Sequence, residues 1–124
     1  KGKNIPHLGL PGNPVSAMIA FEQFGIPAIK LMMGKKDILK SSFKIIIDDE
    51  IINYDNRRVY ARVLVFKGED GKLHASLTGS QSSGVLTSMS KANALAICPE
   101  DREKINVGET INAIFLDDID DLFF

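Results

Sequence analysis

The alternation of apolar and polar residues changes character once along this chain, near residue 42. From Val15 to Gly34 the apolar side chains recur three and four positions apart, which predicts a helix that buries one face. Pro27 interrupts this run. Because a proline lacks the N–H that bonds back one turn, we expect the helix to kink or break there and restart. Gly34 suits the C-terminal cap, and a polar linker follows over residues 35–42.

After residue 42 the period shortens to two, which is typical of β-strands. An Asp70-Gly71 pair marks a hairpin turn. Five strands are predicted, over residues 43–47, 58–66, 73–77, 94–99 and 110–116. Their predicted inward residues include Val59, Ala61, Val63 and Val65 on the second strand and Leu73, Ala75 and Leu77 on the third. The sequence therefore predicts a mainly β fold, with a small five-stranded barrel or sandwich over residues 41–124.

The first forty residues predict a strand, a tight loop and a helix. The apolar run from Ile5 to Leu10 indicates a short buried strand. In the loop after it, Pro11 fixes a φ angle and Gly12 permits a turn. Asn13 is a good N-cap, and Pro14 takes the first helical position. This geometry presents backbone N–H groups to an anion, although a plain strand-to-helix connector is the commoner outcome.

One strand and one helix cannot bury their apolar faces alone. The segment from Ile5 to Met33 is rich in apolar side chains that would then face water. We therefore expect it either to pack against a second copy of the chain or to be partly disordered, and we predict a homodimer.

The composition is that of an ordinary globular protein, with 44% hydrophobic and 25% charged residues. A net charge of −1 gives no reason to expect nucleic acid or an anionic membrane as a partner. No apolar run approaches the roughly 20 residues of a membrane span, and no signal peptide is visible. The single cysteine, Cys98, excludes an internal disulfide and fits a cytoplasmic protein. Because the chain opens at Lys1 without a methionine, we interpret it as a C-terminal piece of a longer protein.

Three groups of residues could carry chemistry. The small residues over 81–84 can aim N–H and hydroxyl groups at one anion, or can form a plain polar turn. Arg62, on the outward face of its strand by alternation, could supply a fork for a phosphate or oxyanion. A solvated surface charge is the plainer alternative for this arginine. Lys91 and Asn93 form a third polar pair, for which we expect a surface position.

The other polar and titratable residues favour structural roles. His7 and His74 have no Cys or carboxylate partners at ligand spacing, so we expect no structural zinc site. Cys98 ends a strand before a proline and is predicted to be a core residue. Residues 48–50 indicate a loop between strands. An acidic tail could bind magnesium, but a solvated terminus is the commoner outcome; its residues are Asp117, Asp118, Asp120 and Asp121.

Four phrases carry a family resemblance. The first is Gly-Leu-Pro-Gly-Asn-Pro-Val-Ser over residues 9–16, and the second is Leu-Thr-Gly-Ser-Gln-Ser-Ser-Gly over 77–84, followed by Ser-Met-Ser-Lys-Ala-Asn-Ala over 88–94. The others are the strand ending Tyr-Ala-Arg-Val over 60–63 and the turn over 107–111. In this order and spacing they resemble the MoeA-type molybdopterin molybdenumtransferases, which include the eukaryotic gephyrin E domain. The similarity covers the chain from Leu8 to about Leu116.

The resemblance implies two structural parts and one activity. Residues 1–40 would be a fragment of an α/β molybdopterin-binding domain, and residues 41–124 a C-terminal β-barrel domain. The family takes adenylylated molybdopterin from the adenylyltransferase that makes it and releases AMP. It inserts molybdate, or tungstate in some lineages, with Mg²⁺ assisting. Substrate and oxyanion are both anionic, so cations and N–H donors are expected around them.

The resemblance also implies the residues of the substrate cleft. Pro11 and Pro14 match two prolines of a loop that borders the cleft, and Arg62 and Ser83 match barrel positions that face it. Ser82 departs from a common glycine and Gly84 from larger residues, but both changes keep the site small. The full set of predicted cleft residues is Pro11, Gly12, Asn13, Pro14, Ser16, Arg62, Gln81, Ser82, Ser83 and Gly84.

No residue of this chain is predicted to be catalytic, because the decisive acidic and lysine residues of the family lie upstream. The chain alone should therefore be inactive. Two alternatives remain open. Gephyrin-like relatives hold a receptor peptide at the seam of the same two domains, and the apolar side chains of Phe115–Phe124 could bind in a similar way. A generic small β-barrel without a ligand also fits the composition.

Overall fold

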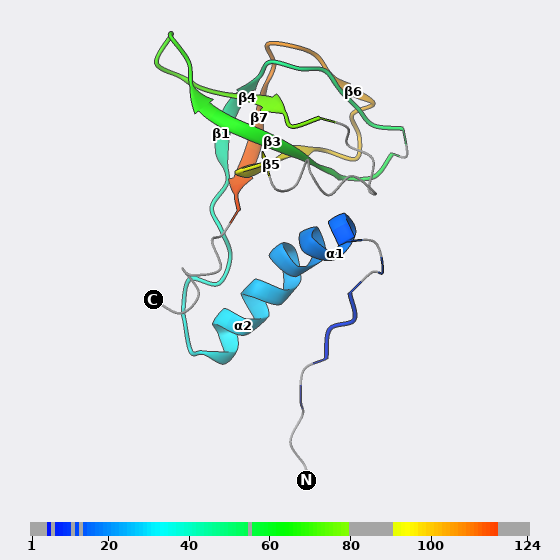
Figure 1. Cartoon of the computed structure of the whole chain (residues 1–124), viewed down its shortest axis with the longest axis vertical. Coiled ribbons are helices and arrows are strands. Elements are labelled where there is room, and N and C mark those ends of the chain that lie inside the picture. Colours follow the sequence, from blue (N-terminus) through cyan, green and yellow to red (C-terminus); the bar gives the residue numbers. More distant parts are fainter. Residues whose placement is uncertain are drawn as a thin grey trace.

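The computed structural model describes residues 5, 7–10, 12, 14–54, 56–79 and 91–116. A helical segment is followed by a small β-barrel (Figure 1). The helical segment consists of α1 (Pro14–Ala20), the π-helical turn η1 (Phe21–Gly25) and α2 (Ile26–Met32). The strands are β1 (Phe43–Ile47), β2 (Ile51–Ile52), β3 (Val59–Lys67), β4 (Leu73–Leu77), β5 (Ala94–Cys98), β6 (Lys104–Ile105) and β7 (Thr110–Phe115). The mainly β prediction is confirmed, and each of the five predicted strands is present.

Five strands close into a barrel in the order β1-β4-β3-β5-β7. β7 pairs with β1 in antiparallel fashion and so completes the ring, whereas β1 and β4 run parallel. Closure gives each barrel strand a hydrogen-bonded neighbour on both sides, which removes exposed sheet edges. The short strands β2 and β6, which the sequence did not predict, form a separate two-stranded sheet.

Small side chains fill much of the barrel interior. Five alanines are almost fully buried there: Ala61, Ala75, Ala94, Ala96 and Ala113. They leave room for the branched side chains of Ile45, Ile47 and Val63, which are also buried. The predicted inward positions on β3 are therefore confirmed: Ala61, Val63 and Val65 are buried in the core, and the partly buried Val59 packs against it. Leu73, also predicted to face inward, is 38% exposed because it lies beside the hairpin turn, beyond the end of the core.

Asn93 extends the barrel ladder with its side chain. Its Oδ1 accepts a hydrogen bond from the Val65 amide at 2.7 Å, and its Nδ2 donates to the Val65 carbonyl at 3.0 Å. The carboxamide thus occupies the place where one more residue of β5 would pair with β3. The expectation of a surface position for Asn93 is wrong, because this partly buried side chain replaces backbone hydrogen bonds. Lys91, its predicted companion, is exposed.

The helical segment continues through Pro27 by widening one turn. The Ile26 amide donates to the Phe21 carbonyl, five residues back, so the bonding pattern shifts just before the proline. A Cβ on Gly25 would lie 2.4 Å from the ring atom Cδ2 of Phe21, so only glycine fits there without movement. The predicted interruption is confirmed, and its form is a π-helical turn rather than a break.

The C-terminal end of α2 carries the predicted glycine cap. Gly34 has a φ of 78°, in the left-handed region that favours glycine. Its amide donates to the Leu31 carbonyl at 3.0 Å, and the Lys35 amide donates to the Lys30 carbonyl at 3.0 Å. These two bonds form a Schellman motif, which fixes where the chain turns toward the barrel.

The helical segment lies against the barrel of its own chain (Figure 1). Ile26 is 4% exposed, and Lys40 Nζ pairs with Glu22 at 2.9 Å while donating to the Phe115 carbonyl at 2.6 Å. The predicted packing against a second copy of the chain is therefore not needed to bury the part of the helical segment that faces the barrel. Several apolar side chains of the helical segment nevertheless stay exposed; they are Met18, Phe24, Leu31 and Met32. No helix in the described ranges is long and apolar enough to cross a membrane.

The predicted buried strand between Ile5 and Leu10 is wrong. Ile5 is 87% exposed, and Leu8 and Leu10 are each about half exposed. The described residues of this run, 5 and 7–10, adopt no regular structure. A strand needs a neighbouring strand to satisfy its N–H and C=O groups, and the described part of the chain pairs none with it.

Replacing Asn93 with alanine should destabilise the barrel. The Val65 amide and carbonyl would both lose their partner, and we expect a loss of about 1–3 kcal/mol in the free energy of unfolding, measured by urea denaturation. Asn112→Ala, at an exposed position on β7, is the matched control and should change stability by less than about 0.5 kcal/mol. Equal stability of the two variants would contradict the assigned role of Asn93.

Candidate functional site

The helical segment and the barrel meet along two adjoining pockets, which we call the seam groove. The first pocket is lined by Ser16, Ile19, Ala20, Gln23, Phe24 and Tyr60. The second shares Gln23 and Tyr60 and adds Glu22, Ile26, Pro27, Ile38, Leu39, Lys40, Ser42, Ile97 and Ile114. The groove is mostly apolar, with a few polar groups at its edges. Ser16, one of the predicted cleft residues, therefore shares a pocket with the β3 side chain of Tyr60.

Arg62 is the next outward residue along β3 after Tyr60, and it is only 4% exposed. The outward face predicted by alternation is correct, since Ala61 and Val63 on either side lie in the core. The alternative of a solvated surface charge is wrong. Burial lowers the pKa of the Arg62 guanidinium below its ordinary value. A charge is costly to bury, so this arginine is a candidate for function.

The buried polar atoms of the described side chains, Arg62 included, all have hydrogen-bond partners. The backbone around Arg62 is equally well anchored. Its carbonyl accepts hydrogen bonds from the Thr78 amide and the Thr78 hydroxyl, both at 3.3 Å. These bonds anchor the backbone of Arg62 to the residue that follows β4.

The segment that carries the predicted serine loop begins and ends beside Arg62. β4 leads out of the barrel through Thr78, which is bonded to Arg62. The chain returns at Asn93, whose amide donates to the Val63 carbonyl at 3.1 Å. Residues 80–90 between these two anchors lie outside the described residues, and so do the predicted cleft residues Gln81, Ser82, Ser83 and Gly84.

The predicted loop at the start of the helical segment is described only in part. Gly12 is exposed in a bend, and α1 begins at Pro14, as predicted for a proline at the first helical position. Pro11 and Asn13 lie outside the described residues, so the predicted N-cap remains a prediction. The structure thus brings Ser16 and Tyr60 together in the groove, with Arg62 on the same face of β3.

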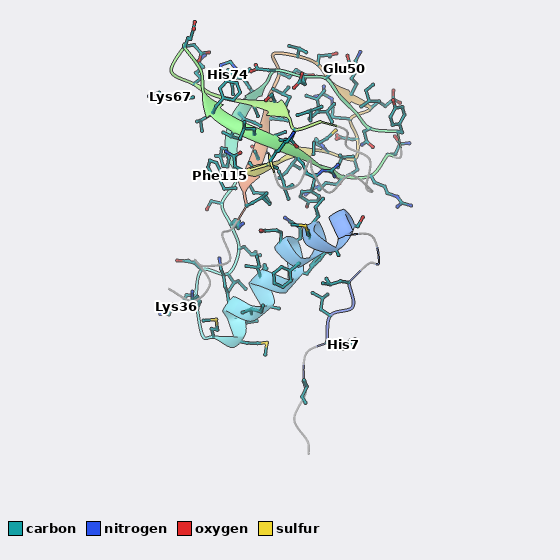
Figure 2. The ribbon with its side chains drawn as sticks, in the orientation of Figure 1. His7, Lys36, Glu50, Lys67, His74 and Phe115 are labelled. Atoms are coloured by element: carbon teal, nitrogen blue, oxygen red, sulfur yellow. The ribbon has the colours of Figure 1, made fainter. Side chains whose placement is uncertain are left out.

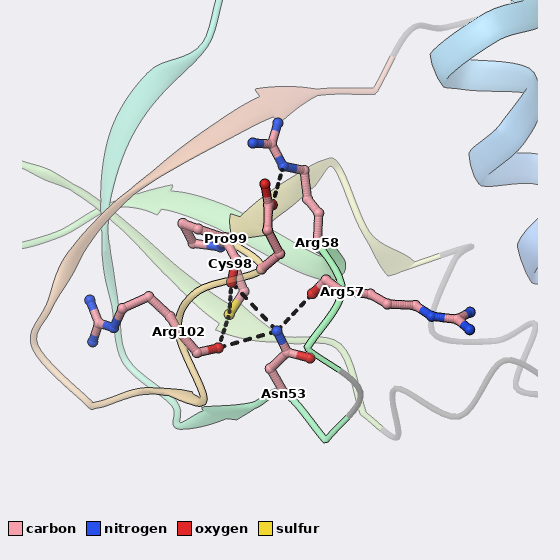
Figure 3. Close-up of polar contacts among 7 residues, drawn as sticks. Asn53, Arg57, Arg58, Cys98, Pro99 and Arg102 are labelled. Atoms are coloured by element: carbon pink, nitrogen blue, oxygen red, sulfur yellow. Dashed lines mark hydrogen bonds and ion pairs between the residues drawn. The ribbon is translucent and has the colours of Figure 1, made fainter.

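Asn53 fixes the start of β3, a role that sequence reasoning missed. Its side chain is 5% exposed, and Figure 3 shows it between two loops. Asn53 Nδ2 donates to the carbonyls of Arg57 at 2.7 Å, Arg102 at 3.2 Å and Pro99 at 3.4 Å. One amide therefore ties the segment leading into β3 to the segment leaving β5. The sequence gives only a turn signal here, because Asn53 lies 46 and 49 residues from two of its partners.

The remaining titratable candidates are Cys98, His74 and the acidic tail. Cys98 is fully buried, as predicted, and burial raises the pKa of its thiol. His74 has two carboxylate partners, Asp48 and Asp70, which the spacing along the sequence did not indicate. Among the described residues no group of His, Cys, Asp and Glu side chains is arranged to hold a metal ion. The part that the structure describes therefore does not fit Mg²⁺, and the acidic tail from Asp117 lies outside it.

Comparison with known proteins places these features in a family. The profile of the MoeA C-terminal region (domain IV) matches residues 44–116. Molybdopterin molybdenumtransferase 1 of Mycobacterium tuberculosis is 31% identical over 116 residues, covering 90% of this chain and 27% of the relative. The molybdopterin molybdenumtransferase of Haemophilus influenzae is 30% identical, covering 90% of this chain and 28% of the relative. This chain thus spans about a quarter of the length of these curated relatives.

Solved structures agree with this placement. The molybdopterin biosynthesis MoeA protein of Pyrococcus horikoshii matches with a TM-score of 0.66 and 28% identity, covering 84% of this chain and 26% of that chain. A molybdenum cofactor biosynthesis protein of Pyrococcus furiosus matches with a TM-score of 0.64 and 26% identity. This match covers 84% of this chain and 36% of that chain. The match extends beyond the barrel, because residues 44–116 alone are a smaller share of the chain.

The substitution Asn53→Asp keeps the shape of the side chain but should weaken the anchor of β3. A carboxylate cannot donate to the three carbonyls, so we expect a loss of about 1–3 kcal/mol in the free energy of unfolding at pH 7. A protonated carboxyl can donate again, so the deficit should shrink as the pH falls toward about 4. Urea denaturation at both pH values measures this, with the exposed Asn112→Asp as control. A deficit that is independent of pH, or shared by the control, would count against the anchor.

Proposed function

Because this chain belongs to the MoeA family, whose C-terminal region (domain IV) its residues 44–116 match, we propose that it is the C-terminal part of a molybdopterin molybdenumtransferase. The whole protein would take adenylylated molybdopterin from the adenylyltransferase that makes it. It would release AMP and insert molybdate into the dithiolene, in the cytoplasm. Molybdopterin and molybdate are substrates in this scheme.

The observation that carries the proposal is the buried Arg62 between the two anchors of residues 80–90. A guanidinium that is already desolvated gives up little further hydration when an oxyanion binds. Its planar fork can donate two parallel hydrogen bonds to a phosphate or a molybdate. Ser83 would add a hydroxyl donor from the segment whose ends flank Arg62. We propose that these two residues orient the anion, and that Ser16 and Tyr60 lie along the same wall of the cleft.

This part of the protein would form one wall of a cleft and carry no catalytic group of its own. The family resemblance puts the decisive acidic and lysine residues upstream, and this chain spans about a quarter of its curated relatives. The described residues offer no ligand set for Mg²⁺, so we assign Mg²⁺ to other parts of the whole protein. The chain by itself is then inactive, although its barrel is complete.

The exposed apolar side chains of the helical segment fit the same proposal. Phe24, Leu31 and Met32 are each more than 60% exposed, which is unusual for side chains of this size. In the whole protein we expect an upstream α/β domain, of which residues 1–40 are a part, to cover these side chains. The homodimer predicted from the sequence would then form through the whole protein.

A peptide-binding role of the gephyrin type is the second candidate. The apolar lining of the seam groove, with Ile26, Ile97 and Ile114, supports it. A peptide groove relies on apolar pockets, whereas a cofactor cleft relies on cations and N–H donors. The two candidates therefore depend on different residues: Ile97 and Ile114 for a peptide, Arg62 for an anion.

Substitutions in the whole protein test the lead proposal. Arg62→Ala and Ser83→Ala should each lower conversion of adenylylated molybdopterin and molybdate to molybdenum cofactor. We expect Arg62→Ala to lower it by about 10- to 100-fold, the value of one charge-assisted hydrogen bond. Arg62→Lys keeps the charge without the fork and should recover only part of the activity. Lys67→Ala, an exposed residue at the end of β3, is the control.

Circular dichroism and thermal unfolding should show that the substituted barrels remain folded. Wild-type activity in both Arg62→Ala and Ser83→Ala would refute the assigned cleft. Loss of activity only where the barrel unfolds would do the same. If these variants are fully active while Ile97→Ser abolishes binding of a partner peptide, measured by calorimetry, the peptide-binding role replaces the lead proposal.

A further inference from the structure

His74 lies on β4 between two carboxylates that come from different loops, away from the seam groove (Figure 2). Its Nδ1 is 2.9 Å from Asp48 Oδ1, and its Nε2 is 2.9 Å from Asp70 Oδ2. Asp48 follows β1 in the turn that leads to β2. Asp70 lies in the turn of the β3–β4 hairpin. The ring therefore bridges two loops that are 22 residues apart in sequence.

The arrangement fixes the charge of the imidazole. A neutral imidazole carries one N–H and one lone pair, so it can donate to only one carboxylate. The second ring nitrogen would then turn a lone pair toward a carboxylate oxygen, which is repulsive. Only an imidazolium satisfies both contacts. The pKa of His74 is raised accordingly, first by its hydrogen bond to Asp48 and then by that to Asp70.

The hairpin backbone is built closely around this ring. A Cβ on Gly68 would clash with Cδ2 of His74, so the chain passes close to the imidazole. The Gly68 amide donates to the Lys72 carbonyl at 2.8 Å, and the Lys72 amide donates to Asp70 Oδ1 at 2.9 Å. Asp70 thus binds both its own turn and His74. Movement of the ring would therefore disturb the hydrogen bonds of the whole turn.

Among the described residues, the other neighbours of the ring place no competing positive charge in contact with it. Phe66 on β3 stacks on it, with ring centres 6.0 Å apart, and Ile46 on β1 pairs with it in the sheet. The pKa of Asp70 is lowered, first by its hydrogen bond with His74 and then by the hydrogen bond from the Lys72 amide. Asp49, which is next to Asp48, accepts a hydrogen bond from the Leu77 amide at its Oδ2, at 2.8 Å.

We propose that His74 is a proton-controlled latch, which ties the β3–β4 hairpin to the β1–β2 turn as an imidazolium and releases one side when it loses a proton. The sign follows from the direction of the shift. A histidine whose pKa is raised by folding stabilises the folded state fully below about pH 6.5, its unfolded value. That stabilisation is lost as the pH rises through the higher pKa of the folded state.

The first test measures the protonation of His74 by NMR. The chain has two histidines, so His7→Gln leaves His74 as the only imidazole. We expect both ring nitrogens to be protonated at pH 6.5 and the titration midpoint to lie above 6.5. Asp48→Asn and Asp70→Asn should each lower the midpoint, and the double variant should bring it to about 6.5 or below. Asp37→Asn, an exposed aspartate in the linker, should leave it unchanged.

The second test measures the hairpin itself by hydrogen exchange of the Gly68 and Lys72 amides. After correction for the intrinsic effect of pH, protection should fall as the pH rises through the His74 midpoint. His74→Gln, which cannot become charged, should show low protection at every pH, while amides in β5 keep theirs. A midpoint at or below 6.5 in the wild type overturns the latch. A raised midpoint that neither aspartate substitution lowers also overturns it, and so does protection that is independent of His74 charge.

Discussion

The barrel depends on β1, which hydrogen-bonds to β7 on one side and to β4 on the other. This strand joins the first part of the β region to the last, and without it β4 and β7 would both be open edges. Its closure places β3 between β4 and β5, where both edges of the strand are hydrogen-bonded. A strand held in this way cannot shift its register, because a slip of one residue would exchange the inward Ala61 with the outward Arg62. The position of the candidate anion-binding arginine therefore follows from the barrel.

Local alternation was sufficient to predict most of the barrel and insufficient for its polar anchors. β1, β3 and β7 each have five or more residues, and their β-branched content or alternation is enough for a strand to be recognised. β2 and β6 have two residues each, so they carry no period at all. The anchors Asn53 and Asn93 bond to backbone groups that are distant in sequence, and a carboxamide in isolation indicates only a turn.

The candidate site shows the same division between local and distant information. Alternation placed Arg62 on the outward face, but its burial depends on which elements the fold packs there, and no local pattern encodes that. His74 lies 26 residues from Asp48, so their contact became visible only once β1 and β4 were paired. The apolar run before Pro11 misled for a related reason. Its composition is that of a strand, yet pairing needs a neighbour, and the described chain supplies none.

The helical segment joins the barrel to the upstream α/β domain that we propose for the whole protein. The widened turn η1 and the glycine cap at Gly34 set its length and direction, so that Glu22 and Ile26 meet the barrel. Leu31 and Met32 line neither pocket of the seam groove and are largely exposed to solvent. Each fully buried side chain of this kind contributes about 1.5–3 kcal/mol, so leaving several exposed forgoes a large stabilisation. That unused apolar surface fits the proposal that another part of the whole protein covers the helical segment.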